Sequence, residues 1–473
     1  MAPSELCFTP ATNLVHMIRQ KDVSVMEVME AHLAQIDRVN PVVNAIVTYH
    51  PDQALDNART ADEAIAKNKP IGPLFGLPIA HKDLVSTKGV RTTFGSPIFR
   101  DFVPDQDELI VERLKKAGAI SVGKTNVPEF GAGSQTFNPV FGATLNPYDT
   151  TRTCGGSSGG AGVALACGML PIADGSDMGG SLRNPANFSN VVGLRPAPGR
   201  VPRWPAANAW GMLSVQGPMA RTVGDTALML SAIAGPDPRA PFSIREPGQS
   251  FALPLERDFK GETIAWSRDF GGLPVDPEVT SAIEEKLGIF EDLGMIVKSG
   301  QPNFAEADDV FKTLRAWTFI QGYGDLLEKH RHQIKDTVIW NLEAGFGLTG
   351  PQIARAEMDR TTLYHRVRKF MDEHAFMIMP VSQVPPFDVN TSYPTEIDGV
   401  QMETYIDWMK SCYYITVTGL PAISVPCGFT SSGLPIGVQI VGRHEDEFGV
   451  LQLAHAFEQI TQTWTQRPPV AVL

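Results

Sequence analysis

Two short glycine- and serine-rich elements, joined by an apolar run, restrict most strongly how this chain can fold. The first is GGSSGG at residues 155–160, and the second is DGSDMGGSLR at residues 174–183. Glycine permits close backbone approaches that side chains forbid, so both elements suit loops whose N–H groups face a ligand. A flexible linker is the alternative, but the apolar run at 161–173 should be buried and should hold both loops in place. A serine surrounded by backbone N–H groups is a candidate nucleophile.

Elsewhere, strand-like apolar runs alternate with helical patterns, which predicts an α/β fold. A capping box, SVME at 24–27, predicts a helix start, and similar spacing predicts a helix at 350–373. Strands are predicted at 72–84, 119–122, 376–380, 422–429 and 436–442. This alternation predicts a mixed, mostly parallel central sheet covered by helices on both faces.

The same pattern divides the chain into segments. Helices are expected over residues 1–69, a sheet-containing core over 70–240 and 376–465, and charged amphipathic helices over most of 241–375. A length of 473 residues suggests two or three domains. Because sheet elements lie on both sides of the helical middle, we expect instead a single large α/β domain spanning the whole chain.

Composition and charge argue against several classes of function. The chain has 52 acidic and 40 basic residues, a net charge of −12, so it lacks the basic surface that nucleic-acid binding requires. The N-terminus, MAPSELCFTP, has no features of a secretory signal. The longest run free of charged and strongly polar residues, 161–173, has 13 residues, against the roughly 20 that span a bilayer. The 5 cysteines form no CxxC pair, so we expect free thiols and no metal site. Together these features lead us to expect no membrane contact and a cytoplasmic location.

Two further glycine patterns suggest other chemistries. GAISVGKT at 118–125 matches a phosphate-binding loop, but that loop should follow a strand, and here a predicted helix precedes it. GGSSGG also contains GxSxG, the nucleophile elbow of Ser-His-Asp hydrolases, which needs a preceding strand and a histidine base. The candidate bases are His330, His332, His365, His374, His444 and His455, and most of them lie in predicted charged helices. A phosphate-loop nucleotide-binding protein and a Ser-His-Asp esterase therefore stay as alternatives.

Lys82 ends the apolar stretch LPIAHK, so burial of its side chain is expected. Burial disfavours the charged ammonium, lowers its pKa and makes the amine available as a base. The alternative is an ordinary lysine paired with the neighbouring Asp83, and the local sequence alone favours that alternative.

A lysine after a strand, then GGSSGG, then GSDMGGSLR closely resemble, in this order, the amidase signature family of serine hydrolases. Further matching segments are FGLPIAHKDL (75–84), GKTNVPEF (123–130), GATLNPYD (142–149), VVGLRPAPGRVP (191–202), GPMARTVGD (217–225), GLPAISVPCG (419–428) and IGVQIVG (436–442). The resemblance covers residues 70–240 and 376–460, and the N-terminal helices more loosely. It implies the family's fold and makes 241–375 a variable region that covers the substrate.

The resemblance implies a catalytic triad of Lys82, Ser157 and Ser181. Ser181 is expected to be the nucleophile, and Ser157 the bridging serine, held in a cis peptide after Gly156. Lys82, neutral at rest, would accept the Ser181 proton through Ser157 and return it to the leaving amine. Such a triad requires no histidine.

The resemblance also implies an oxyanion hole made of backbone N–H groups. These groups belong to Met178, Gly179, Gly180 and Ser181. Ser158 is expected to place a hydroxyl near Lys82, and Asp177 and Arg183 to hold the loop. Two positions depart from the family pattern: Met178 stands where threonine is common, which makes the pocket more apolar, and Cys154 stands where proline often precedes GGSSGG.

We therefore expect an amidase that cleaves linear amides through an acyl-enzyme on Ser181, without a metal or organic cofactor. Small, fairly apolar or aryl amides are the expected substrates, with carbamates or esters as side substrates. The basis is the character of residues in candidate pocket segments: Phe130, Phe137, Met178, Trp210, Trp317, Tyr413 and Tyr414. The rival within the family is the glutaminase component of a tRNA-dependent amidotransferase, its A subunit, which needs partner subunits. Otherwise the expected partner is the small-molecule substrate, and a homodimer is left open.

Overall fold

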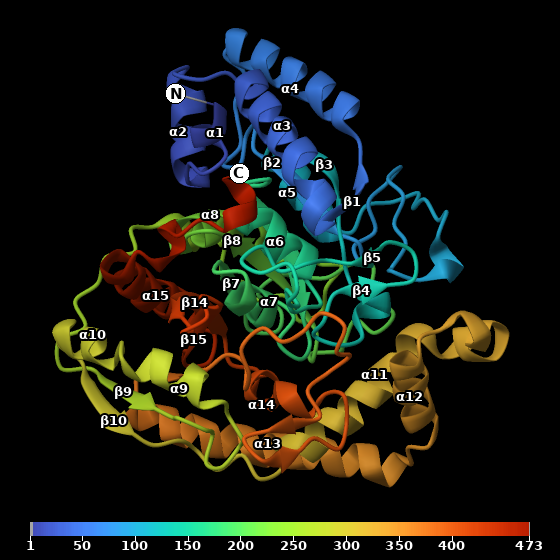
Figure 1. Cartoon of the computed structure of the whole chain (residues 1–473), viewed down its shortest axis with the longest axis vertical. Helices are drawn as coiled ribbons and strands as arrows, with labels where there is room; N and C mark the ends of the chain where they lie inside the picture. The colour runs from blue at the N-terminus through green and yellow to red at the C-terminus, as the bar shows by residue number, and fades with distance from the viewer. Residues whose placement is uncertain (1–2, 473) are drawn as a thin grey trace.

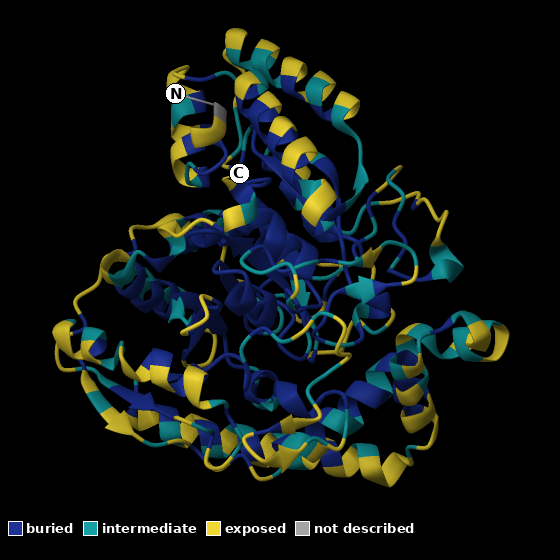
Figure 2. Cartoon of the chain, in the orientation of Figure 1, coloured by how far each residue is buried: buried dark blue, intermediate teal, exposed yellow. Residues whose placement is uncertain are grey.

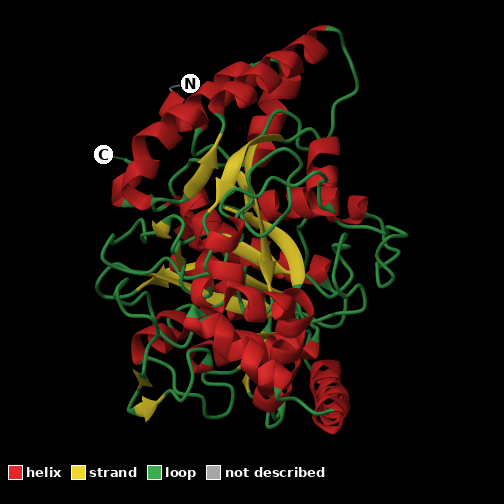
Figure 3. Ribbon diagram, turned by 90° about the vertical axis from the view of Figure 1, so that its right-hand side faces the viewer, coloured by secondary structure: helices red, strands yellow, loops and turns green. Residues whose placement is uncertain are grey.

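The computed structural model describes residues 3–472, and its centre is an eight-stranded sheet in the order β10-β9-β11-β15-β14-β7-β8-β6. Figure 3 shows strands at the centre of the molecule with helices around them. The strands are β6 (Ile172–Asp177), β7 (Val192–Arg195), β8 (Val215–Ala220), β9 (Thr263–Trp266), β10 (Ile296–Ser299), β11 (Phe376–Pro380), β14 (Ala422–Phe429) and β15 (Pro435–Val441). β15 and β11 are buried along their whole length, as their continuous apolar sequences predict. Helices surround this mixed sheet, so the predicted α/β fold is confirmed.

The strand directions differ from the mostly parallel sheet that was expected. β9 pairs in parallel with β10 and with β11, whereas the other neighbours in this sheet, as far as the structure describes it, are antiparallel. Parallel neighbours require long crossover connections, usually helical. Here β14 and β15 are joined by a tight turn at 430–434, and β7 and β8 by a loop at 196–214 that contains no helix.

A second, three-stranded sheet positions the lysine of interest. Its strands are β1 (Ile46–Tyr49), β2 (Pro78–Lys82) and β3 (Ile120–Thr125), in the order β1-β3-β2. β2 is parallel to β3, is buried throughout and also contacts β6 of the central sheet. Lys82, the last residue of β2, therefore lies next to the start of the second glycine-serine element. Two further hairpins pair β4 (Phe137–Asn138) with β5 (Gly142–Ala143) and β12 (Glu396–Ile397) with β13 (Val400–Gln401).

The N-terminal segment is helical, as predicted, and lies at the top of Figure 1. Its helices are α1 (Pro3–Leu6), α2 (Ala11–Gln20), α3 (Val25–Val43) and α4 (Pro51–Ala66). The predicted capping box is present, because the Ser24 side chain accepts from the Glu27 N–H while the Glu27 carboxylate accepts from the Ser24 N–H. Figure 2 shows that these helices expose one face and bury the other against the rest of the molecule.

Helices formed by the middle and the end of the core pack around the central sheet. They are α5 (Leu109–Lys116), α6 (Gly159–Ala166), α7 (Arg183–Phe188), α8 (Val223–Ile233), α14 (Lys410–Thr418) and α15 (Glu447–Thr461). Every residue of α6 is buried (Figure 2). A side chain on Gly160 would meet the backbone nitrogen of Asn126 at 2.3 Å and the carbonyl oxygen of Ala45 at 2.5 Å. Glycine is therefore required for α6 to pack this deeply, and α6 fixes the first glycine-serine element at its N-terminus.

The segment 241–375 is largely helical but not wholly so. Its helices are α9 (Pro277–Glu284), α10 (Leu287–Asp292), α11 (Ala307–His330), α12 (Asp336–Phe346) and α13 (Gly350–Glu373), and the last three pack together at the bottom of Figure 1. However, β9 and β10 extend the central sheet. Each has four residues and β10 is mostly exposed, so neither produces a recognisable apolar pattern. Although α11 and α13 have 24 residues each, no helix within residues 3–472 is long and apolar enough to cross a membrane.

Candidate active site

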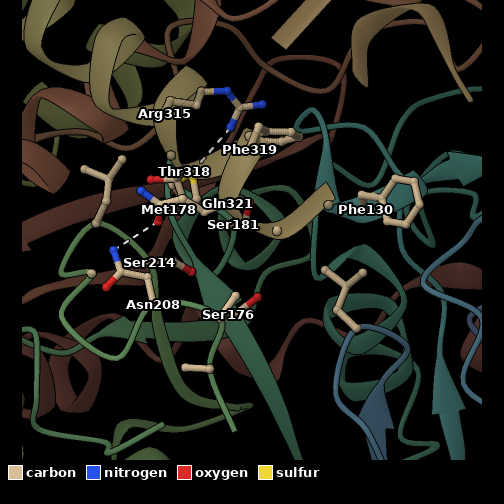
Figure 4. A pocket seen from close by; sticks show the side chains of 18 of the residues that line it. Phe130, Ser176, Met178, Ser181, Asn208, Ser214, Arg315, Thr318, Phe319 and Gln321 are labelled. Carbon is tan, nitrogen blue, oxygen red and sulfur yellow. Dashed lines mark hydrogen bonds between the residues drawn. The ribbon is translucent and has the colours of Figure 1, made fainter. Parts of the chain in front are cut away.

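The two glycine-serine elements meet at one cavity of about 510 Å³. The loop after β6, helix α11 and the segment 203–214 form its walls, and Figure 4 shows their side chains converging on it. Ser157, Ser176 and Ser181 all line this cavity, although Ser157 and Ser181 are only 3% and 7% exposed. The two glycine-serine elements therefore form an ordered site, and the flexible-linker alternative is wrong.

Lys82 extends from β2 into a ring of serine oxygens. Its Nζ donates to Ser157 Oγ at 2.9 Å, to Ser158 Oγ at 2.8 Å, and to Ser176 Oγ at 3.0 Å, and it lies 3.3 Å from the Ser176 carbonyl oxygen. The side chain is completely buried. The structure thus brings Lys82 together with Ser157 and with Ser158, whose hydroxyl was expected there. Ser176 was not singled out from the sequence, although it lies inside DGSDMGGSLR.

The environment of Lys82 favours a neutral amine. Burial lowers the pKa of Lys82 to about 7, even though the negative charges of Asp177 and Asp174 act to raise that pKa. Asp174 is itself held in place, because it accepts the backbone N–H of Lys82 at 2.7 Å and lies 2.5 Å from Nδ1 of His81. A substantial fraction of Lys82 is therefore unprotonated near neutral pH, as a general base requires.

The two serines of interest lie on loops that contact each other. The Gly156–Ser157 peptide bond is cis, and the backbone N–H of Ser158 donates to the Ser181 carbonyl oxygen at 3.3 Å. Ser157 accepts the hydrogen bond from Lys82, whereas the Ser181 hydroxyl has no hydrogen-bond partner among the described residues. The Ser181 hydroxyl therefore lies at the cavity with its oxygen free to meet a ligand.

The backbone N–H groups predicted for the oxyanion hole divide into two kinds. Gly180 adopts a φ of +114° and donates its N–H to Asp177 Oδ1 at 2.9 Å, so this donor is occupied and its expected role is corrected. The N–H groups of Met178, Gly179 and Ser181 have no acceptor within residues 3–472, and all three residues line the cavity. A methyl group at Gly180 would lie 2.5 Å from Cys412 Cβ, so only glycine fits here.

A buried ion-pair network holds this loop. Asp177 accepts from Arg183 Nε and Nη2, both at 3.0 Å, from Arg195 Nη1 at 3.1 Å and from the Leu182 N–H at 3.2 Å. Burial alone would raise the pKa of Asp177, but the two guanidinium groups and the loop N–H groups lower it well below its usual range. Asp177 and Arg183 thus fix the loop, while Arg195, which the sequence did not indicate, completes the charge balance.

The phosphate-loop alternative does not fit the structure. Lys124 lies within β3, where a phosphate-binding lysine would need a loop that leads into a helix. Its Nζ donates to the carbonyl oxygen of Val85 and, at 3.0 Å, to Thr87 Oγ1. The pairing proposed for Asp83 is also wrong, because its carboxylate accepts from Thr93 and lies near the charge of Lys124 rather than that of Lys82.

The Ser-His-Asp alternative lacks its base. None of the six candidate histidines lines the cavity that the described residues form, and the strand required before GxSxG is reduced to isolated bridges at Arg152 and Thr153. Cys154 is fully buried, and burial raises the pKa of its thiol to about 12. The thiol is therefore unreactive, and Cys154 serves only to pack the interior. In the described part of the chain, no group of three or more His, Cys, Asp or Glu side chains is arranged to hold a metal ion.

Only some of the predicted apolar pocket residues line the cavity. Phe130, Met178 and Trp210 do, whereas the other four do not: Phe137, Trp317, Tyr413 and Tyr414. Tyr413, for example, stacks on Phe311 with ring centroids 4.1 Å apart. Many of the residues that were missed lie on the segment 203–214 and on α11; on α11 they include Arg315, Phe319 and Tyr323, which recur every four positions and so share one helix face. That spacing was the available signal.

Comparison with known proteins places this geometry in context. Residues 27–451 match the Amidase family. The chain is 34% identical to an acylamidase of Rhodococcus erythropolis, over 99% of this chain and 98% of the relative. It is 36% identical to the A subunit of the glutamyl-tRNA(Gln) amidotransferase of Geobacillus kaustophilus, over 96% of this chain and 97% of the relative. Its fold matches the crystal structure of a bacterial aryl acylamidase of the amidase signature family, with a TM-score of 0.91, 28% identity and 98% of each chain covered.

Proposed function

The chain belongs to the amidase family of hydrolases that act on carbon–nitrogen bonds, and we propose that Lys82, Ser157 and Ser181 are its catalytic triad. One observation carries this proposal: the Lys82 amine donates to Ser157 Oγ at 2.9 Å, at the edge of a cavity that the Ser181 hydroxyl also lines. A nucleophile needs a base within reach through hydrogen bonds, and we assign to Ser157 the role of connecting the two.

The first half-reaction forms an acyl-enzyme. Ser181 Oγ attacks the amide carbonyl carbon while its proton passes to Ser157 Oγ, whose own proton passes to the neutral amine of Lys82. The backbone N–H groups of Met178, Gly179 and Ser181 stabilise the negative charge that develops on the carbonyl oxygen. Each such donor typically contributes about 2.7–4 kcal/mol to transition-state stabilisation. Lys82 then returns the proton through Ser157 to the leaving nitrogen, the C–N bond breaks and the amine departs.

The second half-reaction releases the acid. A water molecule attacks the ester carbonyl on Ser181 while giving a proton to Lys82 through Ser157, and collapse of the intermediate returns that proton to Ser181 Oγ. Free enzyme and carboxylic acid are the products. The low pKa of Lys82 supports this role, since at neutral pH the amine alternates between its two protonation states at little cost.

The substrates we propose are small amides with an apolar or aryl portion, with carbamates or esters as side substrates. Support comes from the cavity walls, to which Phe94, Phe130, Met178, Phe319 and Tyr323 contribute. Phe130 and Tyr323 pack with centroids 4.4 Å apart, so they offer a continuous aromatic surface. A volume of about 510 Å³ suits a small molecule rather than a protein segment.

A panel of anilides, aliphatic amides, carbamates, esters and glutamine, offered to the purified protein, tests this proposal. We expect anilide cleavage by the wild-type chain, no measurable cleavage by Ser181→Ala, and unchanged cleavage by His455→Ala, which alters a histidine remote from the cavity. Retained turnover in Ser181→Ala would exclude Ser181 as the nucleophile.

The second candidate is the glutaminase component of a tRNA-dependent amidotransferase. It is favoured by the 36% identity to the corresponding Geobacillus kaustophilus protein over nearly the full length of both chains. The same panel separates the two functions. Hydrolysis restricted to glutamine, or appearing only when other subunits are added, would support the amidotransferase and contradict the stand-alone amidase.

A further inference from the structure

Arg315, on α11, presents a buried guanidinium to the substrate cavity. The residue is 3% exposed, and it lines the cavity beside Met178 and Phe319 (Figure 4). Two of its nitrogens are committed to neutral partners: Nε donates to Asn341 Oδ1 at 3.0 Å, and Nη2 donates to the Tyr405 hydroxyl at 2.6 Å. These bonds fix the orientation of the group but contribute no negative charge.

The third nitrogen, Nη1, has only a weak partner. It contacts Met178 Sδ at 3.7 Å, and a thioether sulfur is a poor hydrogen-bond acceptor (Figure 4). No carboxylate within residues 3–472 forms an ion pair with Arg315, in contrast to the equally buried Arg183 and Arg195, which both pair with Asp177. Since a guanidinium stays protonated, a buried one without a counter-ion is costly unless a ligand supplies the charge.

The carboxylates that line the cavity do not fill this role. Glu108 is engaged elsewhere, because its two oxygens accept from the Ser86 N–H at 2.8 Å and from Gln216 Nε2 at 2.7 Å. Glu357 is exposed, and the charge it influences is that of Arg360, which lies on the cavity wall, as Arg203 also does. The cavity therefore contains a preoriented cation with one donor nitrogen still available.

The aromatic surroundings hold the guanidinium still. Its central carbon lies 4.7 Å from the ring centroid of Phe319 and 5.9 Å from those of Phe311 and Tyr405. A rigid, planar guanidinium in an apolar wall matches a planar carboxylate, because the charge-assisted hydrogen bond gains strength where water is excluded.

We infer that Arg315 recognises a carboxylate on the substrate, so that the preferred substrates are small amides with an acidic group. This inference rests on the proposed function, and it makes Arg315 a specificity-determining residue. Because Nη1 contacts Met178, which lines the cavity and whose backbone N–H has no acceptor within residues 3–472, the carboxylate would lie on the side of the scissile carbonyl nearest that residue.

Binding to a variant that cannot turn over separates this inference from the proposed catalysis. In the Ser181→Ala background, calorimetry compares succinic mono-4-nitroanilide with pentanoyl-4-nitroanilide, which replaces the carboxylate by an apolar end. A second pair, 4-acetamidobenzoate and 4-methylacetanilide, carries the carboxylate on the amine side. We expect about 10- to 100-fold tighter binding of the acid in at least one pair, as one charge-assisted hydrogen bond provides.

Adding Arg315→Gln should remove that preference while the affinity for the neutral compound changes less than about threefold, and Arg315→Lys should retain part of it. Arg355→Gln is the matched control, since Arg355 is exposed and pairs with Asp359 on α13. Equal affinity for the acid and the neutral compound in both pairs would overturn the inference before any Arg315 variant is measured. An acid preference that survives Arg315→Gln would also overturn it. Failure of the wild-type enzyme to cleave any anilide would instead contradict the proposed function and leave the binding comparison valid.

Discussion

Two buried lysines at the ends of adjacent parallel strands have very different surroundings. Lys82 ends β2 and Lys124 lies in β3, where it is paired in register with His81. Both side chains are fully buried. The Lys82 amine donates to three serine hydroxyls, two of which, those of Ser157 and Ser176, belong to residues that line the cavity. The Lys124 amine donates instead to a backbone carbonyl and to the hydroxyl of Thr87, a residue that is 1% exposed.

Burial lowers the pKa of both lysines, so a depressed pKa alone does not identify the base. Lys124 is also surrounded by acids, because Asp83, Asp174 and Glu108 all act to raise its pKa. What distinguishes Lys82 is its link to the cavity: a hydroxyl that can carry a proton separates its amine from the site where a substrate would bind. Lys124 has no such link, so its role is structural.

Replacing each lysine by methionine should separate these roles most strongly. Lys82→Met removes the proposed general base, and we expect kcat for an anilide substrate to fall by about 10⁴-fold, as for the loss of a triad member in other hydrolases. Lys124→Met should lower kcat by less than about tenfold, because no proton transfer passes through it. Steady-state kinetics of the two purified variants test this. Comparable losses in both would remove the distinction between the two lysines.

The hydroxyl partners of the two lysines provide the next comparison. Ser157→Ala deletes the group that we propose connects Lys82 to Ser181, and a proton relay of this kind typically contributes about 10²–10⁴-fold to the rate. Thr87→Val deletes the hydroxyl that Lys124 contacts and should leave kcat within about threefold. Burst kinetics with a 4-nitroanilide would show whether acylation is the step that slows. A Ser157→Ala enzyme with normal acylation would show that Lys82 reaches Ser181 without Ser157.

The sequence predicted those parts of the fold that depend on local chemistry. The Ser24 capping box, the buried strand at 376–380 and the helix at 350–373 are present as predicted, because caps and apolar periodicity act within a few residues. Strand direction was predicted wrongly because it depends on how connections are routed. The helix α14, with the sequence KSCYYITVT, was missed because β-branched and aromatic residues favour strands, and only its burial among other helices overrides that preference.

The candidate site divides in the same way. Lys82, Ser157 and Ser181 were proposed from motifs, and the structure places the two serines at one cavity and the Lys82 amine against Ser157. The charge network and the pocket walls could not be obtained that way. Arg195 and Arg315 come from segments outside the glycine-serine elements, and only tertiary packing brings them to the loop after β6. The engagement of the Gly180 N–H by Asp177 is likewise a consequence of three-dimensional geometry.

Between the two lysine variants, Lys124→Met should lose more stability, although Lys82→Met should lose more activity. Lys124→Met removes the amine that donates to the Val85 carbonyl and the Thr87 hydroxyl and leaves these two buried groups only their mutual hydrogen bond of 3.2 Å, and such a loss typically costs about 1–3 kcal/mol. Lys82→Met leaves hydroxyls at the edge of the cavity, where water can replace the lost hydrogen bonds, so its cost should be smaller. Chemical denaturation of both variants measures the difference. A larger loss of unfolding free energy for Lys82→Met would contradict the structural role given to Lys124.

The smallest effect concerns the pH dependence of the reaction. Lys82 acts as a base only when neutral, and its pKa is about 7, so kcat/KM should rise as the pH increases through about 7 and then level off. The negative charge of Asp174 favours the ammonium form, so Asp174→Asn should lower the pKa of Lys82 and move the rising limb to lower pH by about one unit. The asparagine can still accept the Lys82 backbone N–H that Asp174 Oδ1 accepts at 2.7 Å. Asp83→Asn is the control, because Asp83 influences the pKa of Lys124. In this variant the rising part of the kcat/KM profile should stay at the same pH as in the wild-type enzyme. A limb that is unmoved in Asp174→Asn, or that moves to higher pH, would show that a group other than Lys82 governs the profile.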